Sequence, residues 1–169
     1  MRQIALINPE NATAEEVKLY KIREAARAIV IDENNHIALL IVNRERYCKL
    51  PGGGIEITED KITALQRECI EEIGCEIEVI NEIGTIIEYR KRFKLKQISY
   101  CYLAKVKGNK GNPTFTDEEL RKEFKLEWMS YDDALNMFKN CHATSIECKD
   151  YILPRDIKFL QEAKKFMVK

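Results

Sequence analysis

The sequence predicts a layered α/β or α+β fold. Apolar runs of strand length lie before and after a helical pattern in the middle of the chain, and two amphipathic helices follow the last run. Elements in this arrangement bury their apolar faces against one another in layers. At 169 residues the chain is long enough to close a hydrophobic core, so we expect residues 1–169 to form a single domain.

The N-terminal part predicts a lead-in segment and a hairpin. Residues 1–20 form the lead-in, in which residues 1–7 have the pattern of a short strand and residues 11–20 are polar and tolerate a helix. Two apolar runs follow, residues 25–31 and 36–42, and a four-residue polar stretch of Asp, Glu and Asn separates them. Such a stretch favours a turn, so we expect two antiparallel strands joined by it.

A glycine turn opens a helix in the middle of the chain. The turn is Leu50-Pro51-Gly52-Gly53-Gly54, whose glycines permit backbone angles that other residues avoid. At about 100° per residue, one narrow apolar stripe of the following helix is predicted to face the core. The stripe consists of Ile62, Leu65, Cys69 and Ile73. Thr58 is the predicted N-cap and Gly74 the predicted stop.

Three strand-like patterns follow the helix. They cover residues 76–90, 96–107 and 123–129. The alternation of the first is irregular around Asn81 and Gly84, which indicates a bulge or two short strands.

Two helices complete the prediction. Ser130 is placed to cap a helix over residues 131–139, and a C-terminal helix is predicted over residues 154–168. Pro154 suits the first turn of that helix, because its fixed φ matches the helix and its missing amide proton would be unbonded there anyway.

Composition excludes several classes of protein. The chain carries 28 Lys and Arg against 28 Asp and Glu, and this balance argues against binding to nucleic acid polymers or to membrane surfaces. No apolar run approaches the length of a membrane span, and the first ten residues lack the apolar core of a signal peptide. We therefore expect a cytoplasmic protein.

The cysteines predict neither a zinc site nor a disulfide framework. None of the six lies in a CxxC pair, and in a domain of this size without a secretion signal reduced thiols are expected. A catalytic cysteine is not expected, because neither His36 nor His142 has a supporting local signature. The cysteines are Cys48, Cys69, Cys75, Cys101, Cys141 and Cys148.

Three carboxylates lie on the far side of the mid-chain helix from its apolar stripe. Glu68, Glu71 and Glu72 fall within an arc of roughly 100°. Like charges this close repel, so at least one pKa should rise unless a cation offsets the charge. Oxygen donors of this kind suit Mg²⁺ or Mn²⁺. The alternative interpretation is a solvated acidic helix face.

The whole segment resembles the signature of the Nudix hydrolases: Gly, five residues, Glu, seven residues, then Arg-Glu-apolar-x-Glu-Glu-x-Gly-apolar. The matching residues are Gly53, Glu59, Arg67, Glu68, Glu71, Glu72 and Gly74. Cys69 and Cys75 fill the two apolar slots, which free cysteine can do as a small hydrophobe. The resemblance implies an α/β/α sandwich with a central mixed sheet, a divalent cation, and hydrolysis of a nucleoside diphosphate linked to another group.

The resemblance also implies roles for individual residues. The implied metal ligands are Glu68, Glu71, Glu72 and the Gly52 carbonyl. Glu59 and Arg67 would form a salt bridge that braces the loop, and Gly53 and Gly74 belong to the same structural motif. Mg²⁺ is the expected ion, and Mn²⁺ is the alternative.

A further acid is expected in the loop before the last strand, where Nudix enzymes often recruit one. Glu123 is the first choice and Glu119 the second, and a solvated acidic loop is the alternative interpretation. The candidate catalytic residues are therefore Glu68, Glu72 and Glu123. The general base stays open between Glu68 and the loop acid.

Arginines are the candidate phosphate ligands, because their planar fork of donors matches phosphate oxygens. The candidates are Arg44, Arg46, Arg27 and Arg92. Arg44 and Arg46 precede the glycine turn, Arg27 lies inside an apolar strand, and Arg92 belongs to a basic run over residues 90–96. For that run the alternative is a hairpin edge whose lysines prevent aggregation.

Together these features predict a metal-dependent pyrophosphohydrolase. A nucleoside triphosphate, normal or oxidised, is the preferred substrate, because Arg90 and Lys91 stand where ADP-ribose-cleaving relatives often carry proline. Tyr89 keeps dinucleoside polyphosphates open, since the relatives that cut them often carry tyrosine there. Nucleotide sugars and a non-catalytic nucleotide-sensing module are further alternatives. The sequence leaves open the exact substrate, the preferred metal and whether the protein is a homodimer.

Overall fold

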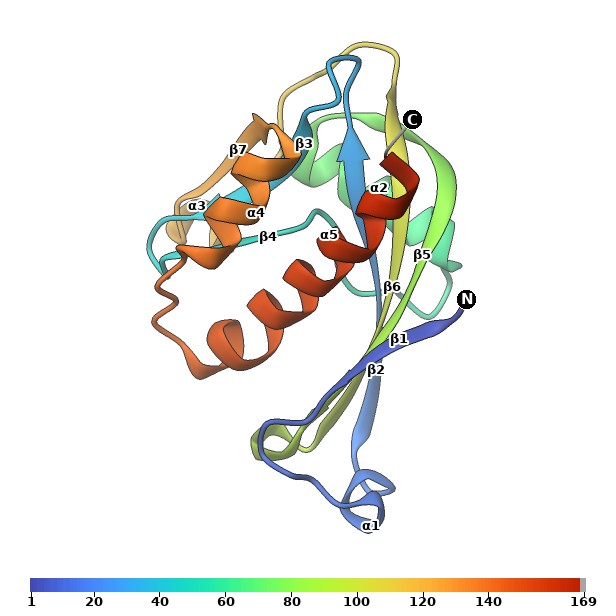
Figure 1. Cartoon of the computed structure of the whole chain (residues 1–169), viewed down its shortest axis with the longest axis vertical. Helices are drawn as coiled ribbons and strands as arrows, with labels where there is room; N and C mark the ends of the chain where they lie inside the picture. The colour runs from blue at the N-terminus through green and yellow to red at the C-terminus, as the bar shows by residue number, and fades with distance from the viewer. Residues whose placement is uncertain (168–169) are drawn as a thin grey trace.

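A mixed sheet of seven strands forms the centre of the computed structural model, which describes residues 1–167 (Figure 1). The strands are β1 (Gln3–Ile7), β2 (Lys21–Ile31), β3 (Ile37–Val42), β4 (Tyr47–Lys49), β5 (Glu76–Arg90), β6 (Leu95–Lys107) and β7 (Phe124–Met129). Their order is β1-β5-β6-β2-β3-β4, and β7 pairs with β3. The pairs β1–β5 and β2–β6 are parallel, whereas the other pairs are antiparallel.

Helices cover both faces of this sheet (Figure 1). The helical elements are α1 (Ala14–Val17), α2 (Lys61–Ile73), η1 (Lys91–Phe93), α3 (Asp117–Arg121), α4 (Tyr131–Lys139), η2 (Cys148–Ile152) and α5 (Leu153–Met167). One buried cluster joins α2 to Ala28 and Val30 of β2, and a second joins α4 and α5 to Ile29 and Ile31. Alternate residues of β2 thus serve opposite layers, as the twofold period of a strand requires. The predicted α/β/α sandwich with a central mixed sheet is confirmed.

The predicted hairpin is present only at its turn. Asp32 organises that turn, since its Oδ1 accepts hydrogen bonds from the amides of Asn34 (2.9 Å) and His36 (2.8 Å). Beyond the turn, Ile31 and Ile37 form the one pair between the two strands. β2 instead pairs along its whole length with β6, while β3 pairs with β7 and β4. The strands separate because each satisfies its backbone groups with another neighbour.

The remaining strands follow the sequence closely. β5 is one continuous strand with register shifts at Val79/Asn81 and Glu82/Gly84, so the bulge alternative is confirmed. β7 ends where α4 is about to begin, and Ser130 caps α4 by accepting a hydrogen bond from the Asp133 amide at 3.1 Å.

The predicted start of α2 is wrong by two residues. Asp60, not Thr58, is the N-cap, because its Oδ1 accepts hydrogen bonds from the amides of Ile62 (2.9 Å) and Thr63 (2.8 Å). Ile62 is 36% exposed and therefore lies outside the buried stripe, whereas Leu65, Cys69 and Ile73 are fully buried. Gly74 ends the helix in the left-handed conformation with φ 64°, as predicted.

The two ends of the chain lie against the sheet in different ways. β1 pairs with β5 and so extends the sheet, and α1 follows it with a capping box formed by Thr13 and Glu16. α5 begins at Leu153, one residue before the predicted start, and Val168, its predicted last residue, lies outside the described residues.

All six cysteines have free thiols in the structure. Within residues 1–167 no helix has the length and apolar character needed to cross a bilayer.

Candidate active site

The glycine turn packs directly on β2. The carbonyl of Pro51 accepts a hydrogen bond from the Ala28 amide and that of Gly53 accepts one from the Ala26 amide, each at 3.0 Å. Gly52 therefore lies opposite Arg27, with φ 123°, and a Cβ there would stand 2.2 Å from the Ala26 carbonyl oxygen. Only glycine fits that position.

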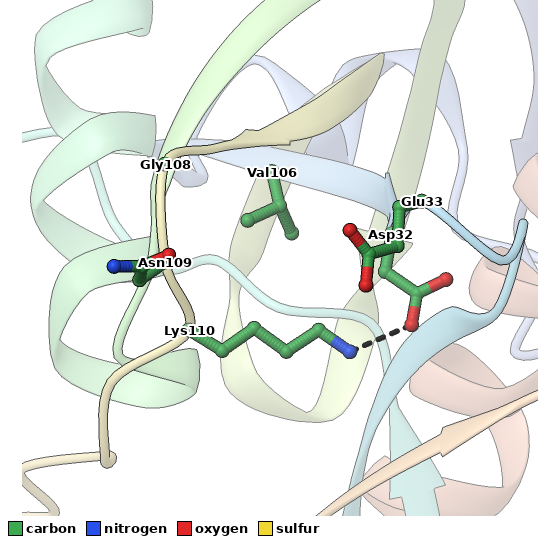
Figure 2. Close-up of a pocket in the computed structure, with 6 residues that line it drawn as sticks. All are labelled: Asp32, Glu33, Val106, Gly108, Asn109 and Lys110. Atoms are coloured by element: carbon green, nitrogen blue, oxygen red, sulfur yellow. Dashed lines mark hydrogen bonds and ion pairs between the residues drawn. The ribbon is translucent and has the colours of Figure 1, made fainter.

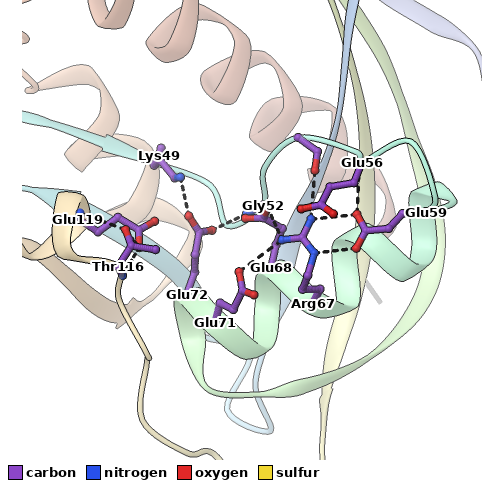
Figure 3. A network of polar contacts seen from close by, with 11 residues as sticks. Lys49, Gly52, Glu56, Glu59, Arg67, Glu68, Glu71, Glu72, Thr116 and Glu119 are labelled. Atoms are coloured by element: carbon purple, nitrogen blue, oxygen red, sulfur yellow. Dashed lines mark hydrogen bonds and ion pairs between the residues drawn. The ribbon is translucent and has the colours of Figure 1, made fainter.

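Glu72 reaches this turn from α2 (Figure 3). Its side chain is nearly fully buried; Oε2 accepts a hydrogen bond from the Gly52 amide at 2.6 Å, and Oε1 pairs with the Lys49 Nζ at 2.6 Å. Burial raises the pKa of Glu72, and the Lys49 ammonium and the Gly52 amide oppose that rise. The carboxylate is thus fixed against the loop and depends on a neighbouring positive charge.

Glu68 contacts the same turn one residue further on. A Cβ at Gly53 would lie 2.2 Å from Glu68 Oε1, so the missing side chain leaves the space that the carboxylate fills. Glu71 is more exposed, with 48% of its side chain accessible to solvent. The two acids nearest the loop are therefore Glu68 and Glu72, one turn of α2 apart.

Arg67 connects these acids to the rest of the loop (Figure 3). It forms a bidentate ion pair with Glu59, with Nε–Oε1 and Nη2–Oε2 distances of 2.7 and 3.0 Å. Its Nη1 lies 2.8 Å from Glu68 Oε1 and 3.4 Å from Glu71 Oε2, and Nη2 also donates to the Gly54 carbonyl at 3.2 Å. The hydrogen bonds from Arg67 to Glu59 lower the pKa of Glu59. One guanidinium thus holds loop and helix in register.

The donor set suits a hard divalent cation. In residues 1–167 no three acidic, histidine or cysteine side chains already converge as a metal cage, because Glu68 is bonded to Arg67 and Glu72 to Lys49. Mg²⁺ does not need such a cage, since it keeps several waters and takes one or two carboxylates together with substrate phosphates. Glu68, Glu71 and Glu72 supply carboxylate oxygens of the kind that such an ion takes, so the residues fit it.

The two candidate loop acids lie around α3 and β7. Glu119 Oε2 accepts hydrogen bonds from the amide and hydroxyl of Thr116, at 2.8 and 2.9 Å, and so caps α3 (Figure 3). Glu123 precedes β7 with φ 58°, and its carbonyl accepts a hydrogen bond from the Asn43 amide at 3.4 Å. Glu119 is therefore engaged in local structure, whereas Glu123 forms hydrogen bonds through its backbone amide and carbonyl.

The candidate arginines lie in separate places. Arg44 and Arg46 lie in the connection between β3 and β4, where Arg44 lines an open pocket of about 480 Å³ with Arg121 and Lys122. Arg92 lies in η1, 3.5 Å from Glu10, and is not brought to the carboxylates. Arg27 is buried beneath the glycine turn, at 6% exposure.

Two residues at the site were not predicted from the sequence. Lys49 pairs with Glu72, and its position shortly before the glycine turn was the only available signal. Asp156 of α5 accepts a hydrogen bond from the Leu50 amide at 2.9 Å, and no pattern in the sequence pointed to it. Asp156 fixes the start of the same turn from the opposite layer.

A second pocket lies away from these residues, between the β2–β3 turn and the end of β6 (Figure 2). Lys110 spans it and pairs with Asp32 Oδ2 at 2.6 Å. It contains none of the predicted site residues.

Comparisons with known proteins agree with this geometry. The chain matches the NUDIX domain family over residues 21–147. A MutT protein from Methanosarcina mazei Go1 is 16% identical with a TM-score of 0.61, covering 89% of this chain and 98% of its own. The Ap4A hydrolase of C. elegans is also 16% identical with a TM-score of 0.61, and the coverages are 88% and 100%.

A UDP-X diphosphatase is 18% identical with a TM-score of 0.56, covering 95% of this chain and 68% of its own. No curated protein sequence matches the chain significantly. The structural likenesses show the shared fold, and the family match covers most of the chain. The chain therefore belongs to the Nudix hydrolase family.

Proposed function

We propose that the protein is a Mg²⁺-dependent pyrophosphohydrolase that cuts a nucleoside triphosphate, normal or oxidised, to the monophosphate and pyrophosphate. The observation that carries the proposal is the contact of Glu72 and Glu68 with the glycine turn, at the Gly52 amide and beside Gly53. Acids fixed on a loop in this way can present oxygen ligands to a cation without first ordering the backbone.

The implied ligands are Glu68, Glu71, Glu72 and the Gly52 carbonyl, which has no protein donor within residues 1–167. Divalent cations held there would offset phosphate charge, orient the substrate and acidify the attacking water. Mg²⁺ is the proposed ion and Mn²⁺ the alternative, because both prefer oxygen donors.

The reaction adds water across one P–O–P link. The water oxygen forms a new bond to one phosphorus, and the bridging oxygen leaves with the other phosphoryl group. Glu68 and Glu123 are the candidates to accept the water proton. Glu68 has the better geometric support, because it lies against Gly53 beside the other proposed metal ligands.

The ion pair between Glu59 and Arg67 is proposed to position the site rather than to react. Arg67 contacts Glu59, Glu68 and the Gly54 carbonyl at once, so it sets the distance between loop and helix. Arg44, Arg46 and Arg27 are proposed substrate ligands, and Arg92 is the weakest candidate because it pairs with Glu10.

Other substrates stand as alternatives. The neighbours include an Ap4A hydrolase and a UDP-X diphosphatase, so dinucleoside polyphosphates and nucleotide sugars belong in any test, together with ADP-ribose. A non-catalytic sensing module is the alternative of a different class, and the full set of carboxylates argues against it. The six free thiols favour a reducing compartment, and we propose the cytoplasm.

The test is product release with Mg²⁺ from a panel of substrates. The panel contains normal and oxidised nucleoside triphosphates, ADP-ribose, dinucleoside polyphosphates and nucleotide sugars. Glu72→Gln keeps the shape of the side chain but removes its charge, so the rate should fall by at least about 10²-fold. Wild-type turnover by a folded, metal-loaded Glu72→Gln variant would contradict the role of Glu72. If the wild-type protein releases product from no substrate of the panel, the sensing module is favoured.

A further inference from the structure

Arg27 is a buried cation without a partner. Its side chain is 6% exposed, and within residues 1–167 its Nε and Nη1 are the only buried side-chain polar atoms without a hydrogen bond. Burial lowers the pKa of Arg27 to about 10, so the guanidinium still carries its charge at neutral pH. An unpaired buried charge is costly and persists where something else compensates for it.

The position of Arg27 places it beneath the glycine turn. Its neighbours Ala26 and Ala28 donate to the Gly53 and Pro51 carbonyls, so Arg27 lies opposite Gly52. Ala26 and Ala28 face the α2 layer, and the alternation of a strand therefore directs Arg27 to the α5 layer. The metal-binding carboxylates are on α2, so Arg27 approaches the turn from the other side.

The α5 side of the sheet holds four arginines, and two of them form ion pairs with neighbouring acids. Arg155 pairs with Asp156 (2.7 Å) and Glu88 (3.5 Å), and Arg90 pairs with Glu88 (2.7 Å) and with Glu147. Arg23 lies four residues before Arg27 on the same face, and within residues 1–167 its hydrogen-bond partner is the neutral Gln97, at 3.0 Å. Within residues 1–167 neither Arg23 nor Arg27 forms an ion pair with a carboxylate, and Asp156 and Glu72 act on Arg27 only through their charge at longer range.

Arg23 leads from this buried position to solvent. Its Nη2 would lie 3.3 Å from a Cβ at Gly54, so it runs along the same glycine turn. It also lines an open pocket of about 760 Å³, whose other charged residues are Lys21, Glu24, Glu56 and Glu59. Arg23 thus lies beside Gly54 and Arg27 opposite Gly52, so the two cations occupy successive positions along the turn.

We propose that Arg23 and Arg27 form an anion subsite that holds a phosphoryl group of the substrate other than those bound at the α2 carboxylates. The inference rests on the proposed function and narrows its substrate class. A substrate that fills both places carries a phosphoryl group beyond the two that flank the cleaved bond. This condition selects nucleoside triphosphates and longer polyphosphates over diphosphates joined to a neutral group, such as ADP-ribose or a UDP-sugar.

The first test measures binding without catalysis. Inorganic tripolyphosphate is added to the wild-type protein in EDTA, and thermal unfolding is recorded. At a concentration about 100 times its dissociation constant the Tm should rise by on the order of 5 °C. Arg27→Met and Arg23→Met should lose most of that rise, whereas Arg2→Met, at an exposed arginine, should keep it.

The stability of the variants separates a ligand-binding arginine from a structural one. Without an anion, Arg27→Met should be at least as stable as the wild type, because an unpaired buried charge has been replaced by an apolar chain of similar length. A structural arginine would give the opposite result. Marked destabilisation, with the same tripolyphosphate response in wild type and variant, would overturn the proposal.

The second test measures selectivity. Arg27→Met should lower kcat/KM for a nucleoside triphosphate by about 10²-fold and that for ADP-ribose by less than about 3-fold. Equal losses on both substrates would contradict the assignment of a third phosphoryl group. If the wild type cleaves nothing on the panel, the proposed function fails, yet the tripolyphosphate experiment still decides whether the subsite exists.

Discussion

Substitution of Gly53 by alanine is the sharpest test of the site, because it moves one carboxylate and little else. The added Cβ would lie 2.2 Å from Glu68 Oε1 and 2.4 Å from its Cδ, so the carboxylate must retreat by on the order of 1 Å to reach van der Waals contact. The obstacle is the end of a flexible side chain, and Gly53 lacks the positive φ of Gly52. The backbone can therefore accept alanine.

The expected cost falls on catalysis rather than on folding. A misplacement of about 1 Å in a catalytic constellation can cost about 10²-fold in rate, which corresponds to about 2.7 kcal/mol of transition-state stabilisation. The free energy of unfolding should change little or rise slightly, since alanine restricts the unfolded chain more than glycine does. Gly53→Ala should thus be a folded protein with a severe loss of kcat.

The neighbouring glycines provide matched controls. At Gly54 an added Cβ meets only the Arg23 guanidinium, whose nearest atom, Nη2, is 3.3 Å away, and no carboxylate, so Gly54→Ala should lose less activity than Gly53→Ala. At Gly52 it meets the Ala26 carbonyl oxygen at 2.2 Å with φ 123°, so Gly52→Ala should destabilise the fold itself.

The assay is steady-state hydrolysis with saturating Mg²⁺, together with urea unfolding of each variant. Wild-type kcat in Gly53→Ala, at unchanged stability, would refute the reasoning that the position of Glu68 limits the rate. Equal losses in Gly53→Ala and Gly54→Ala would show that the loop as a whole, and not Glu68, is sensitive.

Three other perturbations probe the surrounding structure. Asp156→Asn leaves the buried Arg155 without its nearest anion, so the free energy of urea unfolding should fall by about 3 kcal/mol. Asp32→Ala removes two hydrogen bonds to backbone amides and the Lys110 ion pair, and it should cost about 2 kcal/mol. Burial opposes ionisation of Asp32, but Lys110 and the amides of His36 and Asn34 lower its pKa on balance. Because the folded state binds this proton less readily, the wild-type advantage should be full above about pH 4 and disappear as the pH falls below it. Glu59→Gln and Arg67→Met should each lower kcat by at least about 10-fold, and the double variant should be no worse than the poorer single one, since the two residues act as a unit.

The sequence predicts the local part of the site because its determinants lie close together. Gly53, Glu68 and Glu72 occur within one loop and one helix, so spacing alone predicts which side of the helix the acids share. The wrong N-cap at Thr58 is also a local error, of two residues. Thr58 and Asp60 are both residue types that cap helices, and only the hydrogen-bond geometry, which spacing does not contain, shows that Asp60 is the cap.

Long-range contacts could not be predicted in this way. Lys49 and Glu72 are 23 residues apart, and Leu50 and Asp156 are 106 residues apart, so both contacts depend on how the layers stack. Likewise, the single pair between β2 and β3 follows from the parallel pairing of β2 with β6, which no local pattern encodes. The lack of hydrogen bonds at Arg27 Nε and Nη1 within residues 1–167 also depends on how the layers pack, which spacing along the chain does not contain.

The hydrogen bond from Leu50 to Asp156 also affects when the site can mature during synthesis. The loop and helix that carry the carboxylates leave the ribosome early, but the acceptor that fixes Leu50 is made 106 residues later. Domains generally fold as units during synthesis, so the glycine turn cannot reach its final position before Asp156 has been made. A nascent chain of this protein would therefore gain its hydrolytic power late, as α5 docks, rather than when its signature motif first appears.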